Sequence, residues 1–205
     1  MSVTDRRPLA SRDTAWARRI AAALARSSVT PNQISTISVV FAALGAWALV
    51  DAWPLALVGA AICVQLRLLC NLIDGMVAIE GGKQSATGAL YNEFPDRIAD
   101  SLLLVALGYA CDVPWLGWLA ALLAALTAYV RATGGALGLA QDFRGPMAKP
   151  HRMAVLTLAC VIGAAELQWN GTRYALLVAA IVIAAGSALT CAARTLAIAR
   201  ALRAR

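Results

Sequence analysis

Several stretches of this sequence are long, apolar and almost free of charge, and they restrict what the chain can fold into. Residues 115–130 and 174–193 contain no charged residue, and a helix of about 20 residues crosses the hydrocarbon core of a bilayer. Inside hydrocarbon every backbone polar group needs a partner within the protein, so only helices or closed barrels can cross it. The runs are rich in alanine and leucine and do not alternate, which favours helices. The sequence therefore predicts an all-α, polytopic membrane helix bundle.

The overall composition agrees with a membrane location. The chain is 60% hydrophobic and only 14% charged, whereas soluble domains average about 45–50% apolar and about 25% charged residues. A net charge of +7 would suggest nucleic acid for a soluble protein. Here the basic residues flank apolar runs and indicate membrane topology and contact with anionic lipid or phosphate, so we expect no nucleic-acid partner. The single histidine argues against a histidine-based metal site or catalytic triad.

Helix signals divide the chain into three parts. Residues 1–28 form a cytoplasmic segment with an amphipathic helix predicted over Asp13–Arg26, which we expect to lie along the membrane interface; a merely solvated helix is the alternative. Residues 29–197 form a membrane domain with six transmembrane helices, and residues 198–205 form a basic cytoplasmic tail. The spans are predicted at about residues 31–50, 55–80, 88–110, 114–134, 151–165 and 172–196.

Basic residues are distributed unequally between the two sides of these spans. With the N-terminus in the cytoplasm, the outer loops 51–54, 111–114 and 166–173 hold only one of the eighteen Lys and Arg residues, Arg173. Cytoplasmic loops carry an excess of Lys and Arg. The pattern therefore predicts that both termini are cytoplasmic.

Polar side chains that membrane helices normally exclude accumulate between Gln65 and Asp100. They form two stripes: Asn71, Asp74, Gly75 and Ala78 in one, and Gly88, Asn92, Asp96 and Asp100 in the other. The spacing within each stripe places its members on one helical face. Antiparallel pairing of the two helices would bring the asparagines and aspartates of both stripes together. Such an oxygen-rich cluster suits Mg²⁺ or Mn²⁺, and these cations suit a diphosphate.

The spacing of the stripes resembles the signature of the CDP-alcohol phosphatidyltransferases, D-x2-D-G-x2-A-R-x8-G-x3-D-x3-D. Here it reads N-x2-D-G-x2-A-I-x8-G-x3-N-x3-D over residues 71–96, with every gap preserved. The residues that agree in type are Asp74, Gly75, Ala78, Gly88 and Asp96. The chain length, the six-span layout and a Pro31-Asn32 pair before the first span are also similar to the family, so the resemblance covers nearly the whole chain.

Three positions depart from the signature. Asn71 and Asn92 replace two acids, and Ile79 replaces an arginine. Because asparagine offers an oxygen ligand without charge, a two-metal site would be weakened. The N-E-x2-D-x3-D pattern, with Glu93 and Asp100 as additional acids, resembles an uncharacterised bacterial branch of the family, which implies an enzyme of the bacterial inner (plasma) membrane with a rearranged site. The alternatives are a catalytically inactive relative that acts as a membrane binding or assembly protein, and a small transporter.

The resemblance implies roles for individual residues. A phosphatidyl group would pass from a CDP-linked lipid, CDP-diacylglycerol, to an alcohol, with release of CMP. The positions that match ligands of Mg²⁺ or Mn²⁺ are Asn71, Asp74, Asn92 and Asp96, and those that match contacts to CDP are Asn32, Gly75, Ala78 and Gly88. Asp96 also matches the general base, and Asp100, one turn deeper, could orient it or replace it. The structural alternatives are interhelical hydrogen bonds for the asparagines, a packing notch at Gly75 and Ala78, and an ion pair of Asp100 with Arg67 or Arg97.

Basic residues around the fourth and fifth spans predict the kind of alcohol that accepts the phosphatidyl group. Arg131 ends the fourth span, and Lys149 and Arg152 open the fifth. Arginine suits bidentate contact with phosphate, so we expect an acceptor alcohol that itself carries a phosphate, such as glycerol phosphate or inositol phosphate. Topology signalling and headgroup contact are the alternative. Homodimers are common in the resembled family, although nothing in the sequence identifies an interface.

Overall fold

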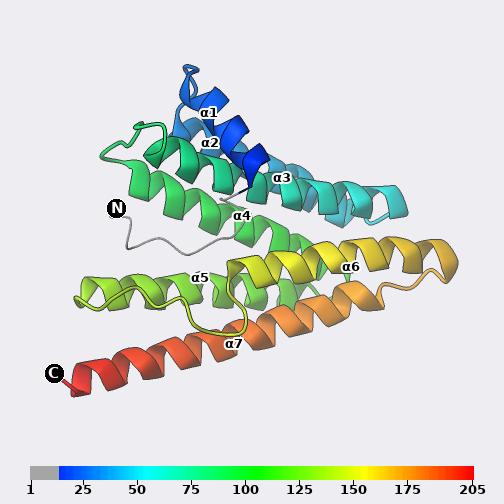
Figure 1. Ribbon diagram of the computed structural model, residues 1–205. Helices are drawn as coiled ribbons and strands as arrows, with labels where there is room; N and C mark the ends of the chain where they lie inside the picture. The colour runs from blue at the N-terminus through cyan, green and yellow to red at the C-terminus, as the bar shows by residue number, and fades with distance from the viewer. Residues whose placement is uncertain (1–13) are drawn as a thin grey trace.

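The computed structural model describes residues 14–205, and over that range the chain folds into seven helices and no strand, which confirms the all-α prediction (Figure 1). The helices are α1 (Ala15–Ala25), α2 (Pro31–Asp51), α3 (Pro54–Ile79), α4 (Gly88–Ala110), α5 (Pro114–Ala136), α6 (Lys149–Trp169) and α7 (Tyr174–Arg203). Within the described residues, five of them are long and apolar enough to cross a membrane, namely α2, α3, α5, α6 and α7.

Helix α4 occupies the predicted third span but is not one of these five. It is 23 residues long, and its first half carries Glu93, Asp96, Arg97 and Asp100. The helix packs against α2 and α5, and its two buried aspartates pair with basic side chains of α3 and α6. The count of six membrane spans therefore depends on α4 and stays a prediction.

Helices α2 to α7 form two groups of three. Figure 1 shows α2, α3 and α4 together on one side and α5, α6 and α7 on the other, and contacts between α4 and α5 and between α3 and α6 join the groups. Successive helices run in opposite directions. The starts of α2, α4 and α6 therefore gather at one end of the bundle, with the ends of α3, α5 and α7. The short connections lie at the opposite end.

Local signals explain most of the helix boundaries. Thr30 accepts a hydrogen bond from the Gln33 backbone amide while the Gln33 side chain accepts from the Thr30 amide, a reciprocal cap that starts α2. Proline stands in the first turn of α2, α3, α5 and α6, where its missing N–H costs nothing. Helix α7 continues to Arg203, so most of the predicted basic tail is helical. Asp13, predicted to begin the first helix, lies outside the described residues, and Thr14 is the N-cap of α1.

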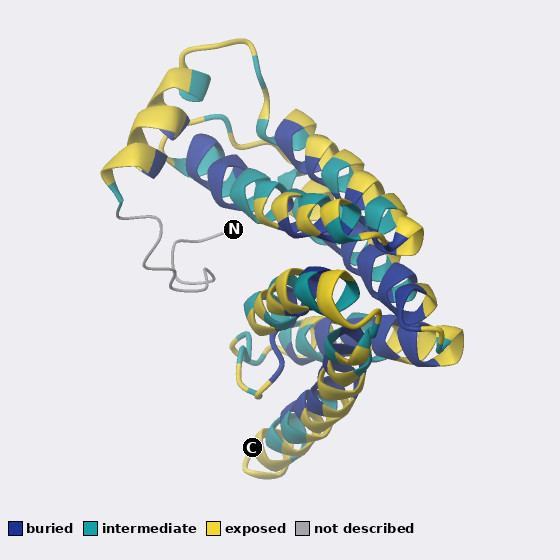
Figure 2. Ribbon diagram, turned by 90° about the vertical axis from the view of Figure 1, so that its right-hand side faces the viewer, coloured by how far each residue is buried: buried dark blue, intermediate teal, exposed yellow. Residues whose placement is uncertain are grey.

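Exposed aromatic residues mark the end of the bundle that carries the short connections. Trp53, Trp115, Trp169 and Tyr174 border these connections and are all exposed, Trp169 at 85%. Figure 2 shows exposed positions on the outer faces of the helices and buried positions where the helices meet. Tryptophan and tyrosine are enriched where a membrane protein meets the headgroup region. This aromatic belt of four exposed side chains therefore agrees with a membrane boundary at this end of the bundle.

Helix α1 packs across the bundle at the other end. Ala17 and Ala21 are buried against α3, while Trp16 and Ile20 stay partly exposed. The ammonium group of Lys83, in the connection from α3 to α4, donates to the carbonyl oxygens of Leu24, Ser27 and Val29 at 3.3, 2.5 and 3.1 Å. A cation at a helix C-terminus also interacts favourably with the helix dipole. Lys83 thus holds α1 beside the α3–α4 connection; the placement of α1 at the membrane interface stays a prediction.

Two glycines allow α4 and α5 to cross closely. A Cβ added to Gly117 would lie 2.7 Å from the Leu104 carbonyl oxygen and 2.8 Å from the Gly108 Cα atom. We expect Gly117→Ala to lower the free energy of unfolding in detergent by about 1–3 kcal/mol, because neither backbone can move without disturbing its helix. Gly59→Ala in α3 is the matched control, since a Cβ there meets no heavy atom within 4 Å. Equal effects of the two substitutions would contradict the close crossing.

Candidate active site

A cleft of about 890 Å³ opens at the end of the bundle where α2, α4 and α6 begin, and residues from all seven described helices line it. The predicted site residues that line it are Asn32, Asn71, Asp74, Gly75, Ala78, Gly88, Asn92, Asp96, Arg131, Lys149 and Arg152. Only Asp100, among the predicted residues, does not. The antiparallel arrangement expected for the two polar stripes is therefore present, and α6 brings the basic residues to the same cleft.

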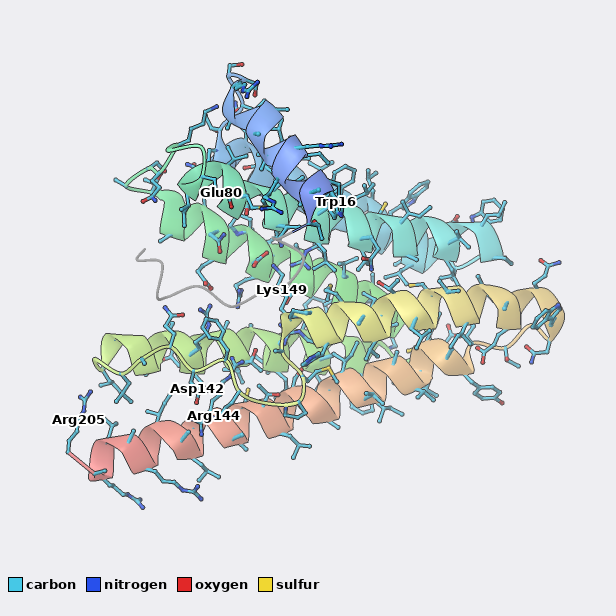
Figure 3. The ribbon with its side chains drawn as sticks, in the orientation of Figure 1. Trp16, Glu80, Asp142, Arg144, Lys149 and Arg205 are labelled. Atoms are coloured by element: carbon cyan, nitrogen blue, oxygen red, sulfur yellow. The ribbon has the colours of Figure 1, made fainter. Side chains whose placement is uncertain are left out.

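Asp96 is the most heavily contacted carboxylate of the cleft. Its Oδ1 atom accepts a hydrogen bond of 2.7 Å from the Asn71 side-chain amide and lies 3.4 Å from Arg67 Nη2. Its Oδ2 atom forms a salt bridge with Lys149. Figure 3 shows Lys149 at the start of α6, between α6 and α4. The lysine is placed there because α6 begins at this residue.

Asp74 has a different environment, because it receives no cation from the protein. Its Oδ2 atom accepts a hydrogen bond of 2.5 Å from the Ser35 hydroxyl of α2. Its Oδ1 atom is buried and has no hydrogen-bond partner. The residue is only 3% exposed, and a buried carboxylate oxygen without a donor is costly. Asp74 is thus the carboxylate with a free coordinating position.

Asp100 lies one turn below the cleft in a buried cluster of charge. Its Oδ1 atom is 2.6 Å from Arg67 Nη2, and its Oδ2 atom is 2.8 Å from Arg152 Nη2. All three side chains are at most 4% exposed. The cluster ties α3, α4 and α6 together. Both carboxylate oxygens are engaged by arginine, which suits positioning of its neighbours better than proton transfer; the predicted catalytic role of Asp100 stays a prediction.

The far wall of the cleft is basic. Arg131 forms a salt bridge of 2.6 Å with Glu93 and lies 5.3 Å from the centre of the Phe143 ring. Arg194 of α7 donates to the carbonyl oxygens of Arg144 and Thr127 at 2.9 and 2.7 Å and also lines the cleft. Arg131 was predicted as part of the acceptor site, whereas Arg194 was not. This wall offers a concentration of positive charge opposite the Asp74 side.

Sequence reasoning missed Ser35 and Arg194. Ser35 stands five residues after Thr30, in the first span, and no feature of its own segment indicates a partner 39 residues away. Arg194 could have been noticed as a charged residue in a run from 174 to 199 that is otherwise apolar or small, since such residues mark functional positions in membrane helices.

The donor set can accommodate a divalent cation. Over residues 14–205 no group of three or more His, Cys, Asp or Glu side chains is placed to hold a metal ion. The oxygen donors would therefore be the carboxylates of Asp74 and Asp96 with the amide oxygens of Asn71 and Asn92. The unpartnered Oδ1 atom of Asp74 fits such an ion, and hard oxygen ligands suit Mg²⁺ and Mn²⁺.

Comparisons with known proteins identify the family. No family model matches the sequence. The archaetidylinositol phosphate synthase of Aeropyrum pernix is 34% identical over 167 residues, which cover 80% of this chain and 81% of that protein. The chain belongs to the CDP-alcohol phosphatidyltransferase family. This membership confirms the resemblance carried by the motif, although two acids of the signature are asparagines in this phosphatidyltransferase.

Other members support the assignment. The phosphatidylinositol phosphate synthase of Mycolicibacterium smegmatis is 28% identical over 182 residues, 84% of this phosphatidyltransferase and 79% of that enzyme. The crystal structure of Mycobacterium tuberculosis phosphatidylinositol phosphate synthase with CDP-DAG bound matches with a TM-score of 0.74 at 22% identity, over 89% of this chain and 92% of that one. The same enzyme in complex with manganese and citrate also gives a TM-score of 0.74, at 23% identity, over 89% of this chain and 88% of that one. The two structures establish a shared fold.

Proposed function

We propose that this phosphatidyltransferase transfers a phosphatidyl group from CDP-diacylglycerol to a phosphorylated polyol of the inositol phosphate class. The acceptor oxygen attacks the lipid-bearing phosphorus, the bond from that phosphorus to CMP breaks, and the hydroxyl proton passes to a base. The observation that carries the proposal is that Asp74 and Asp96 line the same cleft as Arg131, Arg152 and Arg194. The names of the related synthases support inositol phosphate as acceptor.

The three carboxylates have different proposed roles. Asp74, with Asn71 and Asn92, would hold Mg²⁺ or Mn²⁺, which when bound withdraws charge from the diphosphate. Asp96 takes the acceptor proton, because it matches the general-base position of the signature and lines the cleft, whereas Asp100 does not line it. Asp100 positions Arg67 and Arg152 rather than contacting substrate.

Small residues make room for the nucleotide. Gly75, Ala78 and Gly88 line the cleft on α3 and α4, and a Cβ at Gly88 would meet only the Ser85 hydroxyl, at 3.5 Å. Asn32, at the start of α2, donates weakly to Thr87 at 3.4 Å and is available to a ligand. Side chains this small allow a diphosphate or ribose to approach the helix backbone.

The acceptor phosphate is proposed to bind at the arginine wall, with Arg131, Lys149, Arg152 and the newly found Arg194. We expect Arg131→Gln to raise the KM for inositol phosphate by about 10–100-fold with a smaller change in kcat, because a charge-assisted hydrogen bond contributes about 1.5–3 kcal/mol. Steady-state CMP release measures both constants. Arg173→Gln, at the opposite end of the bundle, is the control. An equal rise in the KM for CDP-diacylglycerol would argue against an acceptor site.

The proposed function includes a defined orientation of the enzyme in the membrane. Six spans place both termini in the cytoplasm of a bacterial cell, with the enzyme in the inner membrane and the cleft open to cytosol and inner leaflet. The basic residues at the cleft end and the aromatic belt at the other end support this orientation. A homodimer is the expected assembly from the family.

The deciding experiment is CMP release by purified protein in lipid. CDP-diacylglycerol is supplied with Mg²⁺ or Mn²⁺ and a panel of acceptors: inositol phosphate, glycerol phosphate, inositol and serine. We expect metal-dependent release with the phosphorylated acceptors. Equal activity with serine would contradict the phosphate requirement. No release with any acceptor would instead indicate a catalytically inactive member of the family. The salt bridge between Asp96 and Lys149 agrees with that alternative as well.

A further inference from the structure

The contacts of Asp96 are supplied by the protein itself. One oxygen receives the amide of Asn71 at 2.7 Å and Arg67 at 3.4 Å, and the other receives Lys149 and, at 3.9 Å, Arg97. Each of its two oxygens therefore has a cation nearby. A divalent ion at this carboxylate would have to share its oxygens with Lys149 and Asn71.

The contact between residues 71 and 96 requires an asparagine. Asn71 Nδ2 lies 2.7 Å from Asp96 Oδ1, and an amide can donate at that distance. A carboxylate at residue 71 in the same place would bring two negative oxygens together, an arrangement that needs a cation between them. With asparagine at the first position of the signature, the two side chains are joined by a direct hydrogen bond that needs no cation between them.

Asp74, unlike Asp96, has a carboxylate oxygen without a partner. Ser35 occupies one of its oxygens, while the other is buried, unpartnered and part of a residue that lines the cleft. No Lys or Arg forms a salt bridge with it among the described residues. Of the two carboxylates, Asp74 alone has a coordinating atom that is free for a metal ion.

The number of acidic residues in the signature also favours a metal ion at Asp74 and not at Asp96. The signature has four acids, whereas this chain keeps two of them, Asp74 and Asp96, with Asn71 and Asn92 at the other positions. A second divalent ion would therefore bind with two fewer carboxylates than the signature provides, and beside the ammonium group of Lys149, which already pairs with Asp96. We propose that the enzyme binds a single divalent cation, at Asp74, and that the ammonium group of Lys149 takes the place of a second cation at Asp96. This inference rests on the proposed function.

The position of Lys149 suits this role. It is the first residue of α6, its side chain is 21% exposed, and it lines the cleft. The amide groups at a helix N-terminus add positive potential in the same place. A covalently attached cation does not dissociate, so Asp96 keeps its counter-charge at any metal concentration. Activity should therefore depend on Mn²⁺ as a single-site saturation curve.

The test is the Mn²⁺ stoichiometry of the full-length protein in nanodiscs, measured by equilibrium dialysis and by the electron paramagnetic resonance of free Mn²⁺. We expect one Mn²⁺ per chain. Asp74→Asn should weaken binding by about 10–100-fold or more, while Asp96→Asn should retain one ion. Thermal unfolding establishes that each variant is folded. Two ions per wild-type chain, none at all, or equal losses in the two variants would overturn the proposal.

A gain-of-site variant provides the reciprocal test. Restoring both acids and removing the ammonium, in Asn71→Asp, Asn92→Asp, Lys149→Met, should raise the stoichiometry to two ions. The same two acids with Lys149 retained should bind the second ion more weakly by about 10–100-fold. A second ion of equal affinity in both variants would contradict the role of Lys149.

CMP release measured on the same samples separates the two proposals. Two bound ions together with CMP release would reject the single-cation site and leave the proposed function standing. One bound ion without CMP release with any acceptor would reject the function and leave the single-cation site standing.

Discussion

Asp96→Asn is expected to lower the rate of CMP release by about 10²–10⁴-fold, because the substituted amide cannot accept the proton of the acceptor hydroxyl. The neighbours of Asp96 make this substitution informative. An asparagine at residue 96 keeps the size of the side chain and one oxygen for Lys149, so the cleft should remain assembled. The measurement is kcat with saturating CDP-diacylglycerol and inositol phosphate, beside the binding of CDP-diacylglycerol alone.

The matched control is Asp112→Asn. That carboxylate is also paired with an arginine, Arg173 at 3.5 Å, but it lies at the opposite end of the bundle and its side chain is 82% exposed. We expect its kcat to equal that of the wild type. A decrease of less than about tenfold in Asp96→Asn would mean that another group takes the proton, and Asp100 would then be the next candidate.

Asp100→Leu is expected to lower the free energy of unfolding by about 3–5 kcal/mol, because it removes the nearest counter-charge of two buried arginines. Arg67 and Arg152 are at most 2% exposed and both contact this carboxylate. Without Asp100, Arg67 would keep Asp96 at 3.4 Å and Arg152 would keep the Met147 carbonyl oxygen at 2.9 Å, while three other nitrogens of these arginines have no partner. Denaturant or thermal unfolding in detergent measures the effect.

Replacing the whole cluster distinguishes broken charge pairing from lost packing. Arg67→Met, Asp100→Leu, Arg152→Met removes all three charges together and should recover most of the lost stability, since well-packed apolar residues can replace a buried ion cluster at little cost. A catalytic Asp100 would give a different result: Asp100→Asn would lose CMP release with an unchanged unfolding midpoint.

Local signals in the sequence were sufficient for the helices. The apolar runs, the prolines in first turns and the Thr30 cap act within a few residues, so the predicted spans agree closely with α2 to α5. The last two helices are longer than predicted: α6 begins at Lys149 rather than His151, and α7 extends to Arg203. The ends differ because helix formation continues into polar residues once the preceding turns are in place.

The two polar stripes were also readable from the sequence. Periodicity alone places Asn71 with Asp74 and Asn92 with Asp96, because residues three or four apart share a helical face. The short connection that contains Gly81 and Gly82 then makes α4 run antiparallel to α3, although the main packing partner of both helices is α2. The sequence alone therefore predicts where the candidate site lies along the chain.

Only the tertiary structure decided which partner each charge has. Ser35 meets Asp74 across 39 residues, Arg152 meets Asp100 across 52, and Lys149 meets Asp96 from a different helix group. Such pairings depend on how the helices pack, and a one-dimensional pattern carries no information on which faces of distant helices meet. The sequence by itself therefore determined the membrane bundle and the chemistry available in it. The packing of α2 and α6 on α3 and α4 decided that one carboxylate is left open for a metal ion while the other already has a lysine.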